Sequence, residues 1–270
     1  DSIGVMVVFT NGLKDKKDVL SYGMGNFTEA CISRVNHYAG RIAEQSKRLG
    51  QWMNWDDSYF TNSDTNITTI WYFLKKCFEK GWLIEKYRPM PWCSHCGTSL
   101  SEHELADSYQ DLEHMAVFFK LPIKNTNNSI IVWTTTPWTL SSNVAIAVNP
   151  ELTYAVCKVK STDRNLIICK DAIKALKDDL IEVVKEVKGS ELVGLEYETC
   201  FPELEEQNFV HKIVAWDAVD ATEGSGAVHI APGCGAEDFE LGEKLGLPKV
   251  CPVDESGIFY SNFGFLAGKD

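Results

Sequence analysis

The sequence contains no apolar run long enough to cross a bilayer, and this absence argues against a membrane-spanning helix. One of the longest apolar runs, Gly4 to Phe9, is far shorter than the ~20 residues that a transmembrane helix needs. The first residues also lack a basic stretch followed by a long apolar run, the pattern of a secretory signal. We therefore expect no membrane partner and a cytoplasmic location.

Positive charge is scarce. The 270 residues include 26 Lys and Arg against 38 Asp and Glu, which gives a net charge of −12. An acidic chain repels phosphate backbones, so the composition argues against broad nucleic-acid binding and predicts no DNA partner. Any contact with RNA is expected to be local.

A cysteine framework of the kind found in secreted domains is also missing. The nine cysteines are odd in number, and most stand alone within apolar stretches, as expected of reduced thiols. Only Cys93 and Cys96 have the Cys-x-x-Cys spacing of a zinc knuckle, and no second such pair exists in the chain. Half a structural zinc site, a redox pair and ordinary buried thiols remain alternative interpretations.

The chain divides into two parts that differ in the spacing of their apolar residues. Before residue 88, apolar residues recur every three or four positions and predict helices at 27–49 and 65–80. The two prolines of Arg88-Pro89-Met90-Pro91 break helices and indicate a domain boundary. The rest is mostly strand-like, with a charged helix expected at 171–187. Strands are expected at 3–10, 116–121, 129–133, 144–148, 153–159, 166–169 and 209–215, with a further apolar run at 227–231.

A threonine cluster follows one predicted strand. Thr134, Thr135 and Thr136 leave the apolar run that ends at Trp133 and meet Pro137, which removes a donor and ends strand pairing. Strand alternation places Thr134 and Thr136 on one face. Hydroxyl groups both donate and accept, which suits them to hold a water or an ester. The alternative is an edge strand with solvated threonines.

A second cluster follows a glycine turn. His229 emerges from the apolar run 227–231, a Pro-Gly-x-Gly loop follows, and Glu237-Asp238 stand where a new helix is expected. A carboxylate at such a rim can bind an ammonium group, and it can also simply cap the helix. The corresponding alternative for His229 is a buried core histidine whose ring nitrogens are hydrogen-bonded within the protein.

The two clusters together resemble a known family. Trp-Thr-Thr-Thr-Pro-Trp-Thr-Leu at 133–140 resembles the threonine-rich peptide of isoleucyl-tRNA synthetase (class Ia) editing domains, and the segment around His229 and Asp238 resembles the second half of that pocket. Residues 90–104 resemble the entry to connective peptide 1, the family's editing insertion. Valyl enzymes usually carry Thr-Thr-Arg-Pro-Glu-Thr, so the isoleucyl resemblance is the stronger; a valyl-type editing domain remains an alternative.

The resemblance implies an architecture. The fold class is α/β, with a β-barrel-like editing domain and flanking helices, preceded by a helical segment of a Rossmann-type catalytic domain. Residues 1–88 would be the partial catalytic-domain segment, and residues 89–270 the editing domain, incomplete at its C-terminal end. The His-x-Gly-His and Lys-Met-Ser-Lys-Ser signatures are absent from the sequence, so this chain is not expected to aminoacylate by itself. ATP and Mg would serve only the full-length enzyme.

The resemblance also implies roles for individual residues. Asp238 would anchor the substrate's α-ammonium, His229 would exclude the larger isoleucine, and Thr134, Thr135 and Thr136 would hold the ester and the attacking water. Substrate contacts are further implied for Trp133, near the terminal adenosine, and for Asn143 and Cys234.

The expected function follows from these roles. An apolar pocket gains only ~1–3 kcal/mol of discrimination from one methylene, and the isoleucine–valine pair is the standard illustration of that limit. A second site that hydrolyses the smaller product restores accuracy. We therefore expect a monomer that hydrolyses Val-tRNA(Ile) at the 3′ CCA end without a cofactor, with valyl-adenylate as a second candidate substrate. The alternative from another class is a non-catalytic zinc-knuckle β-barrel binding module.

Overall fold

The computed structural model describes residues 11–13, 16–106, 108–113, 115–159, 164–175, 181–204, 209–222 and 224–270. The strand expected at 3–10 lies outside these residues. The chain divides into two compact units. One comprises the described residues up to Tyr87 together with 95–97, and the other comprises 88–94 and the described residues from Thr98 onward. The predicted boundary at residue 88 lies one residue from this division.

The first unit is helical. Its elements are α2 (Lys16–Tyr22), α3 (Met24–Arg48), the short 3-10 helix η1 (Trp55–Asp57) and α4 (Asp64–Glu79). Gly50 follows α3 in the left-handed region, at φ +84°, which ends the helix without strain. Ser63 caps α4 by accepting a hydrogen bond from the Asn66 backbone at 3.3 Å. The helices predicted at 27–49 and 65–80 are therefore confirmed, and no residue of α3 or α4 is buried.

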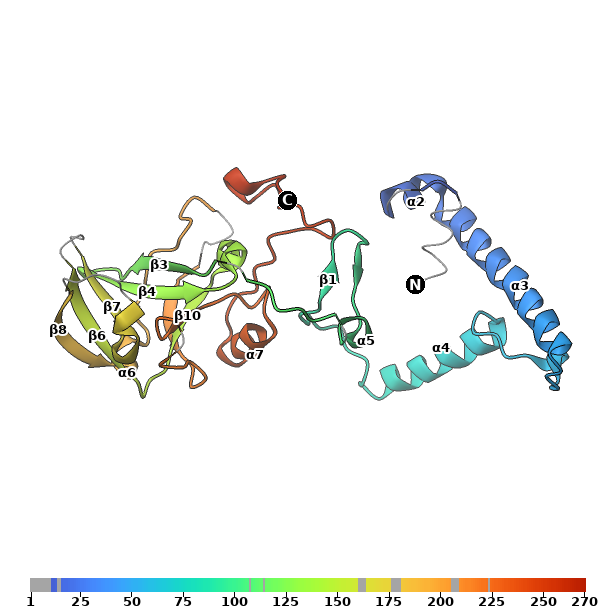
Figure 1. Cartoon of the computed structure of the whole chain (residues 1–270), viewed down its shortest axis with the longest axis horizontal. Helices are drawn as coiled ribbons and strands as arrows, with labels where there is room; N and C mark the ends of the chain where they lie inside the picture. Colours follow the sequence, from blue (N-terminus) through green and yellow to red (C-terminus); the bar gives the residue numbers. More distant parts are fainter. Residues whose placement is uncertain are drawn as a thin grey trace. The chain divides into compact units, whose positions relative to one another are not determined.

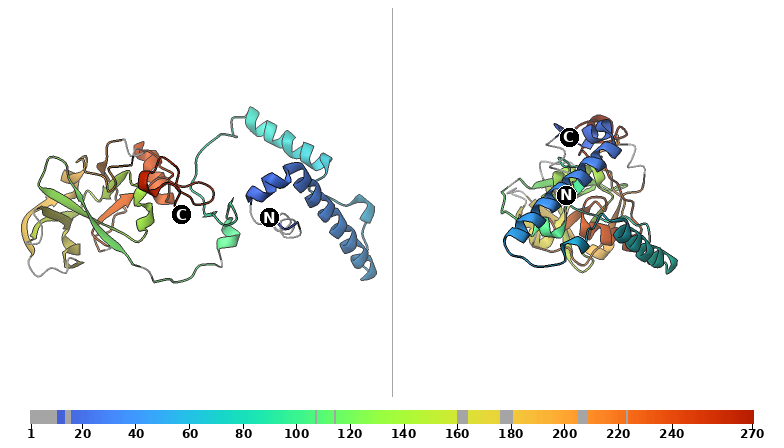
Figure 2. Two further views of the ribbon diagram at one scale, coloured as in Figure 1. Left: turned by 90° about the horizontal axis from the view of Figure 1, so that it is seen from above. Right: turned by 90° about the vertical axis from the view of Figure 1, so that its right-hand side faces the viewer.

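The second unit is built on one mixed sheet, which curls as Figures 1 and 2 show. Its strands follow one another in the order β8-β6-β7-β4-β10-β5-β9, and β3 pairs with β4 from the other side. The pairs β4–β7, β4–β10 and β5–β9 are parallel, and the other pairs are antiparallel. The strands are β3 (Val117–Pro122), β4 (Asn128–Thr134), β5 (Ala145–Val148), β6 (Thr153–Val159), β7 (Asn165–Cys169), β8 (Ile181–Lys188), β9 (Lys212–Ala215) and β10 (Ala227–Ile230).

Shorter elements connect and flank these strands. A small hairpin pairs β1 (Trp92–Cys93) with β2 (Thr98–Ser99). The helical pieces are α5 (Glu102–Leu105), η2 (Pro137–Ser142), η3 (Lys170–Ala175), α6 (Gly189–Leu192), α7 (Ala236–Leu245) and η5 (Gly264–Leu266). The fold class is mixed α/β, as the sequence predicted. Among the described residues, no helix is long and apolar enough to cross a bilayer.

One predicted element is wrong. The charged segment 171–187 was expected to be a helix, but it contains the short η3 and, from Ile181, the strand β8. The segment Ile181–Lys188 is rich in β-branched residues, which lose side-chain freedom in a helix and favour strands. Pairing with β6 along its whole length supplies the backbone hydrogen bonds. The charged side chains of β8 are exposed, and this is why the segment resembled a surface helix.

Two apolar clusters hold the sheet and position the site. The larger lies among β3–β10 and includes the fully buried Tyr154, Ile130 and Ile168. The smaller joins β5 and β10 to α7 and the C-terminal segment, through residues such as Ile230, Leu241 and Phe263. The second cluster packs α7 beside β10, as Figure 1 shows, and the loop between them forms a rim of the cavity described below.

Candidate functional site

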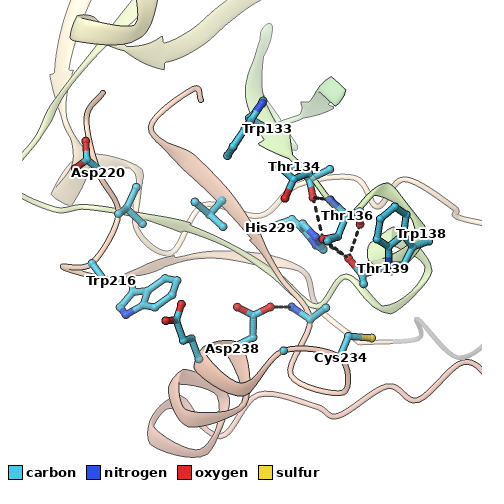
Figure 3. A pocket seen from close by; sticks show the side chains of 17 residues that line it. Trp133, Thr134, Thr136, Trp138, Thr139, Trp216, Asp220, His229, Cys234 and Asp238 are labelled. Atoms are coloured by element: carbon cyan, nitrogen blue, oxygen red, sulfur yellow. Dashed lines mark hydrogen bonds between the residues drawn. The ribbon is translucent and has the colours of Figure 1, made fainter. Parts of the chain in front are cut away.

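A cavity of about 520 Å³ opens at this rim. Its walls come from the end of β4, from η2, from β10, from the start of α7 and from the turn after β9. The volume is in the usual range for small-ligand pockets. Figure 3 shows the side chains of Thr134, Thr136, Thr139, His229 and Asp238 around this space. The structure therefore brings the two motifs together, although they lie far apart in the sequence.

Pro137 creates the first wall. It occupies the first turn of η2, where its missing N–H costs nothing, and it prevents β4 from continuing. Thr134 and Thr136 then lie on one side, as strand alternation predicted, with their Oγ1 atoms 3.3 Å apart. Thr134 also accepts a hydrogen bond from the Thr136 backbone at 3.0 Å. All three predicted threonines, Thr135 included, line the cavity.

Hydrogen bonds continue from these threonines to His229. The Oγ1 atoms of Thr136 and Thr139 are 3.3 Å apart, and Thr139 Oγ1 lies 3.0 Å from His229 Nε2. Thr139 donates its hydroxyl hydrogen to the carbonyl of Thr136 at 2.7 Å. Because that hydrogen is already engaged, Thr139 accepts from His229, and the hydrogen of the neutral imidazole is assigned to Nε2.

His229 is held neutral by its surroundings. It is only 6% exposed, and its Nδ1 atom is buried without a hydrogen-bond partner among the described residues. Burial disfavours the charged imidazolium and lowers the pKa of His229 to about 4. The ring is therefore uncharged at neutral pH, with one nitrogen bonded to Thr139 and the other shielded from the cavity.

Asp238 stands opposite His229 on the first turn of α7. One of its oxygens, Oδ2, accepts a hydrogen bond from the backbone of Ala231 at 2.8 Å. The N-cap of α7 is Gly235, which has no side chain to cap the helix. The hydrogen bond of Asp238 instead joins α7 to the loop that follows β10. Burial raises the pKa of Asp238, the Ala231 N–H partly offsets this, and nearby Glu237 raises it further. A cationic group beside the carboxylate would reverse that shift.

The electrostatic character of the cavity is negative. Among the described residues that line it, Asp220, Glu237 and Asp238 are carboxylates and none is Lys or Arg. Such a lining attracts an ammonium group and disfavours phosphate.

The remaining predicted residues divide between the cavity and its support. Trp133 and Cys234 line the cavity. Gly224 leaves room for Trp133, because a Cβ there would be 2.6 Å from the indole ring. Asn143 does not line the cavity. Its side chain is fully buried, donating to the carbonyl of Ala145 at 3.0 Å and accepting from the hydroxyl of Tyr197 at 2.7 Å.

Sequence reasoning missed several residues of the cavity. Thr139 could have been found, because a proline-initiated turn brings residue i+3 onto the face of Thr136. Trp138 and Glu237 lie within the two motifs and line the same space. Trp216 and Asp220 come from the turn after β9, and no local pattern in the sequence connects that turn to either motif.

The cysteine pair does not complete a metal site. Cys93 belongs to β1 and Cys96 to the turn that leads to β2. Across the residues that the structure describes, no group of three or more His, Cys, Asp or Glu side chains could hold a metal ion. Structural zinc prefers four ligands, so the ligands in the described part of the chain do not suffice, and zinc binding stays a prediction.

Residues 2–240 match the family model described as tRNA synthetases class I (I, L, M and V). The chain belongs to this family. The isoleucine–tRNA ligase of Methanothermobacter thermautotrophicus is 37% identical over 261 residues, which cover 96% of this chain and 24% of that protein. The isoleucine–tRNA ligase of Clostridium novyi is 38% identical over 249 residues, which cover 92% of this chain and 24% of that protein.

This class I synthetase chain thus spans about a quarter of the length of the curated relatives that it matches. Among solved structures, the editing domain of the P. knowlesi cytosolic leucyl-tRNA synthetase is similar at 14% identity with a TM-score of 0.40, covering 48% of this chain and 62% of that one.

Proposed function

We propose that this chain carries an editing site that hydrolyses the ester of a misacylated tRNA, with Val-tRNA(Ile) as its substrate. The supporting observation is the convergence of a hydroxyl cluster, a buried neutral imidazole and a carboxylate in one cavity of about 520 Å³. The isoleucine–tRNA ligases among the relatives support the choice of amino acid. The whole protein would ligate isoleucine to tRNA with ATP, acting as a cytoplasmic monomer.

Asp238 would bind the α-ammonium of the misattached valine. Its Oδ2 is fixed by the backbone of Ala231, so the carboxylate is oriented before the substrate arrives. The negative lining favours the ammonium and keeps the phosphates of the CCA end outside. Trp133 and the exposed Trp138 supply aromatic surface for the terminal adenosine.

His229 would exclude isoleucine by its bulk. Its Nε2 hydrogen is used by Thr139 and its Nδ1 is buried, so neither nitrogen offers a lone pair to a water in the cavity. This favours a mechanism in which the threonine hydroxyls, and a ribose hydroxyl of the substrate, position the attacking water. The rival role, His229 as general base, predicts a pH–rate profile that loses its titration in His229→Ala. An unchanged rate near pH 7 with relaxed specificity would rule that role out.

The function is tested by deacylation of Val-tRNA(Ile) against Ile-tRNA(Ile). Asp238→Ala should lower the rate on Val-tRNA(Ile) by at least about a hundredfold, because losing one partner of a buried ion pair costs ~3–5 kcal/mol. Glu240→Ala removes an exposed carboxylate from the same helix and should leave the rate within about twofold. A non-catalytic binding module predicts no deacylation by the unaltered protein, and full activity in Asp238→Ala would refute the assigned role.

A further inference from the structure

A buried polar cluster lies behind η2 and outside the cavity. Its members are Asn143, Tyr197 and His211, which are 0%, 1% and 4% exposed. The Tyr197 hydroxyl donates to Asn143 Oδ1 at 2.7 Å. His211 Nε2 lies 3.1 Å from the backbone carbonyl of Asn143, and because a carbonyl only accepts, the imidazole is the donor. Asn143 is thus held at both its side chain and its backbone.

The two partners of Asn143 are themselves fixed. The backbone of Tyr197 donates to the carbonyl of His211 at 3.2 Å, and their rings meet edge to face at 5.4 Å. Phe209 also stacks on His211, with 4.6 Å between the ring centres. A buried network whose members are bonded to one another specifies one arrangement, because any other leaves a polar group unpaired.

Asn143 connects this cluster to the cavity wall. Its backbone N–H donates to the carbonyl of Leu140 at 3.2 Å and closes η2. The next residue, Val144, donates to the carbonyl of Ile230 at 2.9 Å, directly after His229. Asn143 therefore stands where the turn that carries Thr139 meets the strand that carries His229.

We propose that Tyr197 and His211 are positioning residues for the deacylation site, acting through Asn143 on the turn that carries Thr136 and Thr139. They touch no cavity surface, so they would act only by holding η2 against β10. Part of this inference rests on the proposed function, because its effect on rate requires that function. Its effect on the imidazole of His229 does not.

Tyr197→Phe is the decisive variant, because it removes one hydroxyl and leaves the ring. In the full chain, we expect kcat for Val-tRNA(Ile) to fall about tenfold or more and KM to change less than about threefold, since a small misplacement of reacting groups affects mainly the chemical step. His211→Leu should have the same effect, whereas His211→Gln retains a side-chain N–H donor and should recover most of the rate.

Tyr154→Phe is the matched control. Tyr154 is also fully buried, and its hydroxyl donates to the carbonyl of Gly226 at 2.6 Å, not to a residue of η2. It should cost comparable thermal stability and preserve kcat. If both tyrosine variants lower kcat in proportion to their loss of Tm, or if Tyr197→Phe leaves kcat unchanged, the positioning role is overturned.

A spectroscopic measurement separates this inference from the proposed function. Side-chain ¹⁵N NMR distinguishes the imidazole tautomers, and His229 of the unaltered protein should give the Nε2–H signature. In Tyr197→Phe the ¹⁵N shifts of His229 should move toward the average of the two tautomers, and in Tyr154→Phe they should stay unchanged. Failure of the unaltered protein to deacylate Val-tRNA(Ile) would refute the proposed function alone. An unperturbed His229 signal in Tyr197→Phe would refute the positioning role alone.

Discussion

At the residue scale, His229 illustrates how burial removes a titration from the physiological range. Only desolvation lowers its pKa, to about 4, and no charged neighbour contributes. Between about pH 6.5 and 4, the His229 imidazole is therefore protonated in the unfolded chain but neutral in the folded protein. The stability attached to the neutral ring is complete above that pH and is lost as the pH falls toward 4.

This predicts a specific acid sensitivity. Between pH 7.5 and 4.5, the unaltered protein should lose roughly 2–3 kcal/mol more unfolding free energy than His229→Gln, at ~1.4 kcal/mol for each pKa unit. Urea denaturation at the two pH values measures the difference. The raised pKa of Asp238 acts with the opposite sign but is common to both proteins. Equal losses in the two proteins would show that His229 is not desolvated.

Gly224 gives a second prediction at this scale. It has φ +62°, and a Cβ would lie 2.6 Å from the Trp133 ring. Gly246 has φ +66° with nothing within 4 Å of the same position, so it isolates the backbone cost. Gly246→Ala should lose about 1–2 kcal/mol, and Gly224→Ala should lose more and displace Trp133 from the cavity wall. Thermal unfolding of the two variants tests this; equal losses would mean that Trp133 yields freely.

At the scale of elements, the sequence predicted α3, α4 and most strands because their apolar periodicity agrees with their final environment. It failed at β8, where the deciding contact is β6, a strand more than twenty residues away in the sequence. Local propensity cannot report a partner that distant, and the alternating charges of the segment fit either element.

Val183 tests the nature of β8 by the sign of one substitution. It pairs with Cys157 and is 45% exposed, so its replacement leaves little cavity. Val183→Ala should reduce the unfolding free energy by about 0.5–1 kcal/mol in a strand. The same change in a helix would increase it by a few tenths. A stabilised variant in chemical denaturation would contradict the sheet.

The candidate site could be predicted only where it depends on local sequence. The threonine hydroxyls, His229 and Asp238 belong to short motifs, and their chemistry follows from the residue types alone. The wall from the turn after β9, with Trp216 and Asp220, depends on the parallel pairing of β5 with β9, which no short motif encodes. The supporting position of Asn143 depends likewise on Tyr197, which lies 54 residues later.

At the scale of the whole molecule, the net charge of −12 and the carboxylate-lined cavity would govern contact with tRNA under the proposed function. A surface that repels phosphate can accept the aminoacylated end of a tRNA but gains little from its backbone. The chain itself therefore offers little for recognition of the rest of a tRNA, and the curated relatives that it matches are about four times as long.

The isolated chain should therefore bind tRNA(Ile) weakly, with a Kd above about 1 µM at physiological salt. The slope of log K against log salt should be shallower than about −2, because few phosphates are neutralised. Fluorescence anisotropy with tRNA labelled away from its 3′ end measures both quantities. Nanomolar binding with a steep salt slope would contradict this electrostatic description.

The hydrogen bond between Thr139 and His229 joins residues 90 positions apart, and this has a consequence for biosynthesis. At about 5–20 residues per second, the threonine peptide leaves the ribosome several seconds before the strand that completes its pocket. During that interval β4 has β3 and β7 beside it but not β10, so its parallel edge at Trp133 is unpaired. Slow or interrupted synthesis between residues 140 and 230 would leave that edge open to pairing with other chains, which makes this stretch the vulnerable period in the protein's maturation.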